Sequence, residues 1–441
     1  MCPRLPLIAI VGATGTGKSQ LAVTIASRFN GEVINGDVLQ MYEGLPITTN
    51  KTSLEERGNI PHHLLGCIPL AEETWTVKQF VSRATKIIEQ IRSRNKVPIL
   101  VGGTHYYTQS LLFTNTVVNE CSEFMTEEEQ ERKWPVLGAD TSVMLKELYR
   151  ADPEMAERWH PNDRRKIRRS LEVCLTTGQR TSDIYKKQQE PRSENLSDGL
   201  NTDHCGIETR GCEKRGSFLR YDTLIFWTHA ATAHLNARLE ERVDNMIRKG
   251  LIQEVASLQT FLQDQKQEGK SLDEGKGIWI AIGAKEFVPY FQSTDRSDHL
   301  RQTSIEKTKI ATKQYAKSQV RWIRLKLQRA LAAAGSSNTM FLLDGSDVCQ
   351  WSQSVKSKAL EITSSFLSGG TLPSPATLSD AASEYLVTTE QETHGARLCD
   401  ACNKTLMSEK QWADHLKSKG HKRAIRPRID WKTLYPKSDG T

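Results

Sequence analysis

The sequence contains no apolar run long enough to cross a membrane, which takes about 20 consecutive apolar residues. Its nine cysteines are scattered, and only Cys399 and Cys402 lie close together, which argues against a disulfide-stabilised extracellular scaffold. The charge excess is small, since 60 Lys and Arg face 53 Asp and Glu. The first predicted strand begins near Leu5 and leaves no room for a cleaved presequence. We therefore expect an intracellular, cytoplasmic protein without membrane association, although the sequence is compatible with additional mitochondrial and nuclear pools.

Apolar runs and helical patterns alternate in the N-terminal part of the chain. Strands are predicted at 7–11, 32–35 and 97–101, and a helix at 77–94. This order predicts a parallel sheet with right-handed crossovers. Apolar runs at 222–227 and 340–343 are expected to rejoin that sheet. The fold class predicted is therefore α/β, with a P-loop NTPase-like parallel core.

The composition changes between the two halves of this predicted sheet. Residues 120–185 are charged and helical, with no strand pattern, and predict a helical insertion. Residues 186–218 are polar and lack periodicity, which is typical of disorder. The predicted parts are 1–119 (first part of the core), 120–185 (helical insertion), 186–218 (disordered loop), 219–366 (second part of the core, with a basic helix), 367–395 (linker) and 396–425 (small C-terminal module).

Residues 12–19, GATGTGKS, match the phosphate-binding pattern G-x-x-x-x-G-K-[ST] without a mismatch. A predicted strand precedes them and a helical pattern follows, which is the context that the motif requires. Backbone N–H groups and the helix N-terminus would surround an anion, Lys18 would add a full positive charge, and the hydroxyl of Ser19 would hold Mg²⁺. The residues predicted to bind a phosphate or pyrophosphate are Gly12, Thr14, Gly15, Thr16, Gly17, Lys18 and Ser19.

Polar residues follow two other predicted strands at the edge where open α/β sheets place their sites. Asp37 comes after the second strand and could accept a proton or hold Mg²⁺, or cap a turn; Gln40 lies close behind it. Thr104 follows Gly102-Gly103 after the third strand and could contact a substrate or cap the next helix. Arg238 and Arg242, spaced i, i+4, could face one anion or pair with acidic residues on their own helix.

Two groups of cations suit a phosphodiester backbone, although charge runs are more often solvated helix faces. Five cations stand within residues 163–169, among them Arg165, Lys166, Arg168 and Arg169. A second stripe at i, i+4 spacing includes Lys313 and Lys317.

The tail carries a metal-binding pattern. Cys399-x2-Cys402-x12-His415-x5-His421 has the spacing of a two-Cys, two-His zinc finger. Thiolates from a turn and imidazoles from a helix can complete a tetrahedron at this spacing. We therefore predict one structural Zn²⁺, while the ligands leave open whether the finger contacts nucleic acid or protein.

Taken together, the ordered motifs resemble the tRNA dimethylallyltransferase (tRNA isopentenyltransferase) family, in its eukaryotic form with a C-terminal finger. The resemblance extends over about residues 5–330, and the finger adds the tail. The matching segments are 12–19, 35–42, 47–51, 60–63, 101–107, 160–163 with Arg168-Arg169 and Leu171-Glu172, 282–287 and 312–317. Two positions depart from the family pattern: Val38-Leu39 replace Ser-Met after the aspartate, and Ala284 replaces an aromatic residue.

The resemblance implies transfer of a dimethylallyl group from dimethylallyl diphosphate to the exocyclic amine of the adenosine 3′-adjacent to the anticodon. The P-loop would hold the donor's diphosphate, with Mg²⁺ on Ser19, and Asp37 would accept the amine proton. The partners implied are the tRNA anticodon stem-loop and the donor, and we expect a monomer. The catalytic residues implied are Asp37, Thr104, Arg238 and Arg242; those facing tRNA are Asp37, Gln40, Thr104, Arg165, Lys166, Arg168, Arg169, Lys285, Lys313 and Lys317.

Two other classes of protein share parts of this pattern. A P-loop kinase of a small metabolite or RNA would use the same phosphate loop, but the apolar strand at 97–101 ends in glycines and threonine instead of an acid. A non-catalytic RNA-binding zinc-finger protein with a relic P-loop is disfavoured because Lys18, Ser19 and Asp37 are intact.

Overall fold

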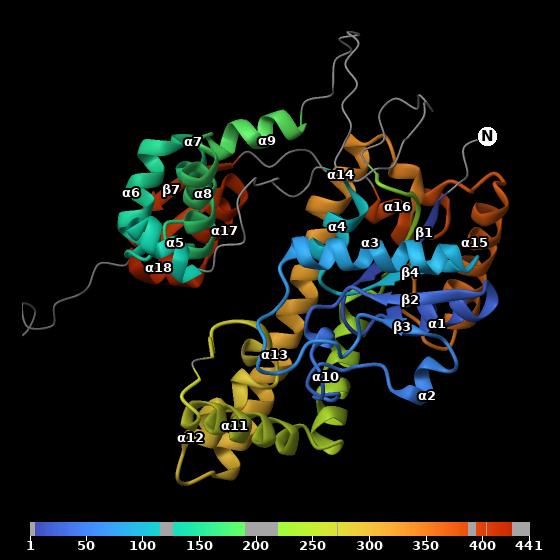
Figure 1. Ribbon diagram of the computed structural model, residues 1–441, viewed down its shortest axis with the longest axis horizontal. Helices are drawn as coiled ribbons and strands as arrows, with labels where there is room; N and C mark the ends of the chain where they lie inside the picture. The colour runs from blue at the N-terminus through green and yellow to red at the C-terminus, as the bar shows by residue number, and fades with distance from the viewer. Residues whose placement is uncertain are drawn as a thin grey trace, which may run out of the picture. The chain divides into compact units, whose positions relative to one another are not determined.

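The computed structural model describes residues 5–114, 127–189, 219–270, 272–386, 394–402 and 404–425. The chain forms two compact units (Figure 1). The core unit contains residues 1–117 and 199–388, and the helical unit contains residues 118–198 and 389–441. Most of the segment predicted as a disordered loop, 190–218, lies outside the described residues.

The core unit is built on a parallel sheet with the strand order β3-β2-β4-β1-β5-β6. The five strands predicted from the sequence are confirmed, and the sixth, β3, was missed because two residues carry no periodicity. The strands are β1 (Pro6–Gly12), β2 (Gly31–Asn35), β3 (His62–His63), β4 (Val97–Val101), β5 (Asp222–His229) and β6 (Met340–Asp344). Because all strands are parallel, the loops that follow β1, β2, β4, β5 and β6 gather along one edge of the sheet.

Both faces of this sheet are buried, which explains its apolar strands. Side chains alternate along β1, so that Ile8 and Ile10 point to one face while Leu7, Ala9 and Val11 point to the other. The first face packs against α1 (Lys18–Arg28) and α15 (Lys358–Ser368). The second packs against α3 (Val77–Ser93), α4 (His105–Leu112) and the helices that follow β5.

The second half of the core unit is mostly helical. The predicted basic helix at 303–333 corresponds to α13 (Asp298–Trp322), which continues through a π-helical turn (Ile323–Leu327) into α14 (Gln328–Ala333). This half also contains α10 (Thr232–Arg248), α11 (Leu251–Gln267) and α12 (Val288–Gln292), while the short helix α2 (Leu54–Arg57) belongs to the first half. Among the described residues, none of the helices combines the length and apolar composition that crossing a bilayer requires.

The core unit continues past its predicted end at residue 366. Helix α16 (Asp380–Tyr385) lies within the segment predicted as a linker, and Ser379 caps it by accepting a hydrogen bond from the N–H of Ala382. Ala382 is fully buried in the core, and Tyr385 packs against Trp227. Apolar side chains within a Ser- and Pro-rich stretch therefore hold this segment against the core as far as Leu386.

The described part of the predicted insertion, 127–185, is helical and contains no strand, as predicted, but its last helix continues to Gln189, so the prediction of disorder is wrong for residues 186–189. Its helices surround a small apolar core that includes Leu137, Met144 and Leu171. The carboxylate of buried Asp152 accepts hydrogen bonds from the N–H groups of Met155 and Ser182, and so joins two helices. The helices are α5 (Glu127–Lys133), α6 (Thr141–Ala151), α7 (Pro153–Arg158), α8 (Arg164–Thr177) and α9 (Thr181–Gln189).

A buried carboxylate stabilises the edge of the sheet. Glu32 on β2 is paired with His63 at 2.6 Å, Arg94 at 2.7 Å and Lys96 at 2.8 Å. Burial alone would raise the pKa of Glu32, but the hydrogen bonds from Lys96, His63 and Arg94 outweigh it and lower the pKa from 4.5 to about 2.

We expect Glu32→Gln to lower the free energy of unfolding at neutral pH by about 2–3 kcal/mol, because Arg94, Lys96 and His63 lose their shared carboxylate partner. Since the folded-state pKa is depressed, the wild-type advantage is full above pH 4.5 and is lost as the pH falls toward 2. Urea unfolding at a series of pH values measures this difference. A gap between the two proteins that persists unchanged at low pH would contradict the assignment.

Candidate active site

The phosphate loop follows β1 at the centre of the sheet and leads into α1. Gly15 and Gly17 adopt left-handed backbone conformations, with φ of 81° and 79°, which side chains disfavour. Thr16 turns its hydroxyl inward to the carbonyl of Ala13 and to Thr228, so its contact with a phosphate would come from the backbone N–H. Lys18 Nζ donates to the carbonyl of Ala13 at 2.7 Å. Burial lowers the pKa of Lys18 to about 8, and nearby Asp37 partly opposes this shift.

Asp37 follows β2, and the loop around it is held by side-chain hydrogen bonds. Its N–H donates to Asn35 Oδ1 at 3.0 Å, and Asn35 Nδ2 donates in turn to the carbonyls of Asp37 and Leu64. The carboxylate accepts the N–H of Leu39. Burial raises the pKa of Asp37, while the charge of Lys18 opposes the rise. Asp37 is therefore a fixed carboxylate beside the phosphate loop with a raised proton affinity.

Thr104 follows β4 and joins this group. Its hydroxyl accepts the N–H of Val38 at 3.2 Å, which ties the loop after β4 to the loop after β2. The two glycines before it are required by close approach: a Cβ on Gly102 would lie 2.3 Å from the backbone of Gly36, and one on Gly103 would lie 3.0 Å from a carboxylate oxygen of Asp37. The alternative role of Thr104 as a helix cap is not observed, because its side chain makes no capping hydrogen bond.

Two residues of α13 complete the site, and the sequence did not assign them a role in it. Gln319 accepts the N–H of Thr14 at 2.8 Å and donates to the carbonyl of Gly103 at 2.9 Å, so one amide bridges the phosphate loop and the loop after β4. Tyr315 extends its hydroxyl toward the same carbonyl, and burial, with the nearby charge of Asp37, raises the pKa of that hydroxyl. The sequence signal that could have identified both residues is their i, i+4 spacing, which places them on the same face of a basic helix.

His105 is a further residue that sequence analysis left without a role. It is buried in the first turn of α4, and neither ring nitrogen has a hydrogen-bond partner among the described residues. Burial, reinforced by the charge of Lys18, lowers its pKa to about 3. His105 is therefore neutral at physiological pH and is kept so partly by the cation of the phosphate loop.

The structure separates the roles of Arg238 and Arg242, which the sequence treats as equivalent. Arg238 donates to the carbonyls of Gly345 at 2.7 Å and Ser346 at 2.6 Å, so it anchors the loop after β6. Arg242 lies where its charge acts on both Asp37 and Lys18. Since Arg238 is engaged with backbone carbonyls, we expect Arg242 to be the arginine that faces the anion.

A cavity of about 800 Å³ opens beside this group, between residues 46–57 and α10. Arg242 lines it from the helix, and Lys51 and Arg57 line it from the loop. Burial lowers the pKa of Lys51 to about 8, and its ammonium donates to the carbonyls of Tyr42 and Gly44. Gln40 orders the same loop by donating to the carbonyls of Thr49 and Asn50. Arg238 and Lys249 also line the cavity, so cations outnumber the acidic residues Glu56 and Glu241 in its wall.

The two departures from the family pattern are accommodated by the core. Val38 and Leu39 are partly buried and pack against the larger apolar cluster of the core unit. Ala284 is buried in the same cluster, one residue before Lys285. Val38, Leu39 and Ala284 therefore contribute to the packing of the core unit.

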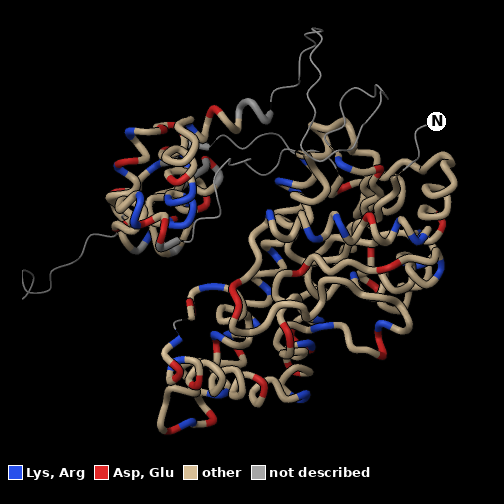
Figure 2. Tube along the Cα trace, viewed as in Figure 1, with Lys and Arg blue, Asp and Glu red and all other residues tan. Residues whose placement is uncertain are grey.

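The cations predicted to face RNA have different environments. On α8, Arg165 is exposed, and Lys166 is exposed and paired with Asp163 at 2.6 Å. Arg168 is only 15% exposed and turns toward Gln130 and Glu172, so it contributes to the packing of the helical unit and offers little surface to RNA. Figure 2 shows basic and acidic residues interspersed on both units.

The remaining predicted RNA contacts are distributed over two units. Arg169 on α8 pairs with Glu172 at 3.0 Å. In the core unit, Lys285 lies 3.8 Å from Glu286, Lys313 pairs with Glu240, and Lys317 is exposed on α13. Lys313 and Lys317 lie on α13, the helix that also carries the site residues Tyr315 and Gln319, whereas Lys285 lies in a separate short turn.

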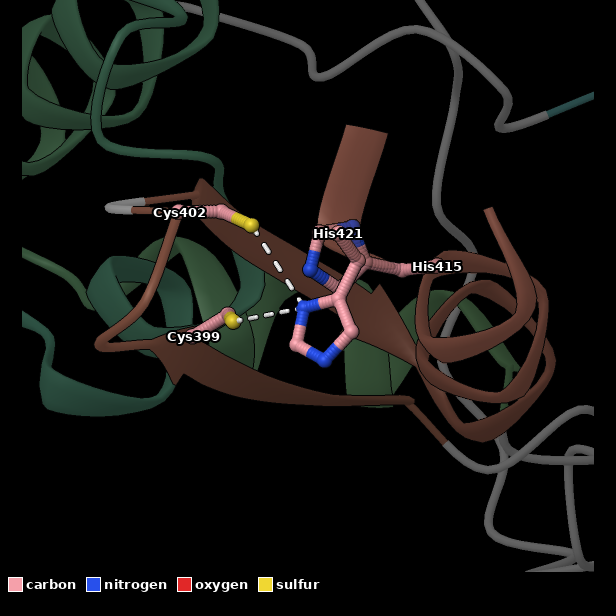
Figure 3. A group of neighbouring side chains, drawn as sticks. All are labelled: Cys399, Cys402, His415 and His421. Carbon is pink, nitrogen blue, oxygen red and sulfur yellow. Dashed lines mark hydrogen bonds between the residues drawn. The ribbon is translucent and has the colours of Figure 1, made fainter. Parts of the chain in front are cut away.

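The four predicted zinc ligands come together in the helical unit (Figure 3). Cys399 and Cys402 lie at the turn between β7 (His394–Cys399) and β8 (Lys404–Ser408), while His415 lies on α17 (Glu409–Lys417) and His421 on α18 (Lys419–Ala424). Their ligand atoms lie within 4.8 Å of one another, and Nε2 of His415 is buried without a hydrogen-bond partner in the described part of the chain. Two sulfurs and two imidazoles in this arrangement fit a structural Zn²⁺.

We expect Cys402→Ser to release one zinc ion per chain and to unfold residues 396–425, because metal binding supplies most of the folding energy of such a small module. The core unit should keep its thermal transition. Metal content by atomic absorption, together with proteolysis of the tail, measures both effects, and Cys349→Ser serves as a control at an exposed cysteine outside the cluster. Full retention of zinc by Cys402→Ser would contradict the ligand assignment.

Comparison with known proteins bears on this geometry. Residues 40–326 match the family described as IPP transferase, and residues 398–421 match a zinc-finger of C2H2 type. The tRNA dimethylallyltransferase of Schizosaccharomyces pombe is 36% identical over 442 residues, which cover 96% of this chain and 95% of the relative. The tRNA dimethylallyltransferase of Homo sapiens is 35% identical over 96% of this chain and 86% of its own length. A solved eukaryotic dimethylallyltransferase acting on tRNA aligns with a TM-score of 0.75 and 32% identity, over 95% of this chain and 96% of that structure.

Proposed function

Since the chain belongs to the IPP transferase family, we propose that it transfers a dimethylallyl group from dimethylallyl diphosphate to the exocyclic amine of the adenosine next to the anticodon, on its 3′ side, in tRNA. The observation that carries this proposal is the convergence of an anion site and a proton acceptor. The charges of Lys18 and Arg242 act on Asp37, and Thr104 holds the loop that carries Asp37 by accepting the N–H of Val38.

The anion site suits the departure of a diphosphate. As the bond between the allylic carbon and its oxygen breaks, the electron pair leaves with the diphosphate, so negative charge develops there. The backbone of residues 12–19, the ammonium of Lys18 and the guanidinium of Arg242 stabilise that charge. A Mg²⁺ ion held through the hydroxyl of Ser19 would add positive charge at the same place.

The acceptor side suits alkylation of an aromatic amine. A new bond forms between the exocyclic nitrogen and the allylic carbon, and that nitrogen then loses a proton. Asp37 is the carboxylate placed to accept it, and Thr104 holds the adjoining loop. The target base must leave its stack in the tRNA for its amine to reach Asp37.

Recognition of tRNA involves the exposed cations of both units. Arg165 and Lys166 on α8, and Lys317 on α13, offer contacts to phosphates that carry no sequence information. Strand β7 of the finger contacts α7, so the cations of the finger belong to the same unit as Arg165 and Lys166. Binding of tRNA should therefore weaken with salt.

The decisive experiment incubates the full chain with unmodified tRNA, Mg²⁺ and labelled dimethylallyl diphosphate, followed by nucleoside analysis. Label in the adenosine next to the anticodon is the expected result. Transfer of a labelled γ-phosphate from ATP to a metabolite or RNA would instead support a P-loop kinase. The absence of an acid at the end of β4 disfavours that class. If a folded chain binds tRNA but transfers nothing, the result supports a non-catalytic RNA-binding zinc-finger protein with a relic P-loop.

The protonation of Lys18 predicts an alkaline limit to donor use. With a pKa of about 8, Lys18 loses its charge as the pH rises through that value, so kcat/KM for the donor should fall above about pH 8. Lys18→Arg should abolish this limb, because arginine stays charged. Lys51, whose pKa is also about 8, is the matched control: Lys51→Arg should leave the limb in place. The measurement is kcat/KM for the donor as a function of pH, at saturating tRNA, for the wild type and the two variants.

A further inference from the structure

One aromatic side chain outside the catalytic group lies directly against the phosphate loop. Trp351 places the six-membered ring of its indole between Gly17 and Gly345. A Cβ on Gly17 would lie 2.3 Å from this ring, and a Cβ on Gly345 would lie 2.8 Å from it. The indole therefore packs directly against the backbone of the phosphate loop at Gly17, where α1 begins.

The segment that carries Trp351, residues 344–351, is fixed at several points and is called the cover segment below. The N–H of Gly345 donates to the carbonyl of His229 at 2.9 Å, and Ser346 Oγ accepts the N–H of Ala231 at 2.8 Å. Arg238 adds two hydrogen bonds to the carbonyls of Gly345 and Ser346. The cover segment is thus tied to the loop after β5 and to α10, so its position beside Gly17 is built into the fold.

The strand order gives the phosphate site two distinct ends. Asp37 and Thr104 follow β2 and β4, on one side of β1, whereas the cover segment follows β6, on the other side. A ligand lying along the phosphate loop therefore has one end toward Asp37 and the other toward Trp351. The first end must hold the reacting carbon, because the amine proton is accepted there.

These two ends make different demands on a ligand. A prenyl diphosphate carries its only substituent at the Asp37 end and presents a bare terminal phosphate to Trp351. A nucleoside di- or triphosphate bound while a tRNA base occupies the Asp37 end would have to place its ribose and base at the other end. The indole stands in that place, and a group excluded by fixed neighbours cannot be accommodated without displacing them.

We propose that Trp351, held by the cover segment, is a specificity-determining residue that closes the phosphate site to nucleotides while the tRNA base is bound, because it admits only ligands that present a bare phosphate toward the indole. This inference rests on the proposed function, since the donor defines which end carries the substituent. It accounts for how a phosphate loop of the type used by nucleotide-binding proteins can serve a ligand that is not a nucleotide.

Competitive binding tests the inference without relying on transfer. Full-length protein saturated with unmodified tRNA is titrated with inorganic pyrophosphate and with ADP, and the ratio of the two dissociation constants is compared among variants. The wild type should bind ADP at least about 10-fold more weakly than pyrophosphate. Trp351→Ala should bring the two constants within about 3-fold of each other, while Trp351→Phe, which keeps a ring in place, should stay near the wild-type ratio.

A merely structural role for Trp351 would lower thermal stability and leave the ratio unchanged. Trp351→Leu, which keeps apolar volume for the core but not the flat ring, replaces Trp351→Ala if that variant does not fold. Equal binding of ADP and pyrophosphate by the wild type, or an unchanged ratio in folded Trp351→Ala and Trp351→Leu, would overturn the inference. Failure of the proposed function is seen separately, as the absence of labelled adenosine in the transfer assay with the wild type.

Discussion

Asp37→Asn should slow the chemical step by about 10²–10⁴-fold while tRNA binding stays close to that of the wild type. The amide has nearly the same shape as the carboxylate and can keep the hydrogen bond from the N–H of Leu39. It cannot accept the proton that leaves the amine. The loss should therefore appear in single-turnover rates at saturating tRNA and donor, and not in the dissociation constant of tRNA.

The pH dependence gives this prediction a second measurement. Burial raises the pKa of Asp37 above its usual 3.8, and the base works only when deprotonated. The wild-type rate should therefore rise with pH on an acidic limb that lies above pH 3.8, and the variant should lack that limb. Asp344→Asn, at an aspartate after β6 whose carboxylate binds Ser346, controls for a loss of charge elsewhere on the same sheet edge. A single-turnover rate of Asp37→Asn close to that of the wild type would remove Asp37 from the role of base.

Arg242→Ala should slow transfer by about 10²–10³-fold, because a guanidinium that faces the developing charge of the diphosphate is lost. Arg238→Ala is the matched control, since it removes the same group four residues away on α10. Arg238 is engaged with the carbonyls of Gly345 and Ser346, so its loss should slow transfer by less than about 10-fold.

Single-turnover rates with saturating tRNA, measured over a range of donor concentration, distinguish the two arginines. The effect of Arg242→Ala should persist at saturating donor, because the interaction strengthens as the leaving group separates. Equal losses in the two variants would mean that neither guanidinium has a privileged position at the anion.

Sequence patterns were sufficient for the strands of the core other than β3, and for the zinc ligands. The continuous apolar runs at 7–11 and 97–101 predict strands because a parallel sheet covered on both faces requires them. The finger was predictable because the spacing of four ligands is dictated by tetrahedral coordination. In both cases the physical constraint acts between residues close in sequence.

The assembly of the site could not be predicted as well from the sequence, because it depends on contacts between residues far apart in the chain. The bridge made by Gln319 joins positions 305 residues apart, and no local pattern signals it. The distinction between Arg238 and Arg242 depends on the carbonyls after β6, and the burial of Arg168 depends on Gln130 and Glu172 in the fold. Identical residue types in one motif thus acquire different roles only when the tertiary environment is known.

The amide of Gln319 has a consequence for the entropy of reaction. It holds the backbone of Thr14, on the donor side, and the carbonyl of Gly103, on the acceptor side, at a fixed separation. Two substrates that bind to these loops become neighbours at a distance that folding has already set, which is the origin of high effective molarity in enzymes. Lengthening this link by a methylene, or removing it, would let the allylic carbon drift relative to the amine, and water would then compete for the carbon while both substrates remain bound.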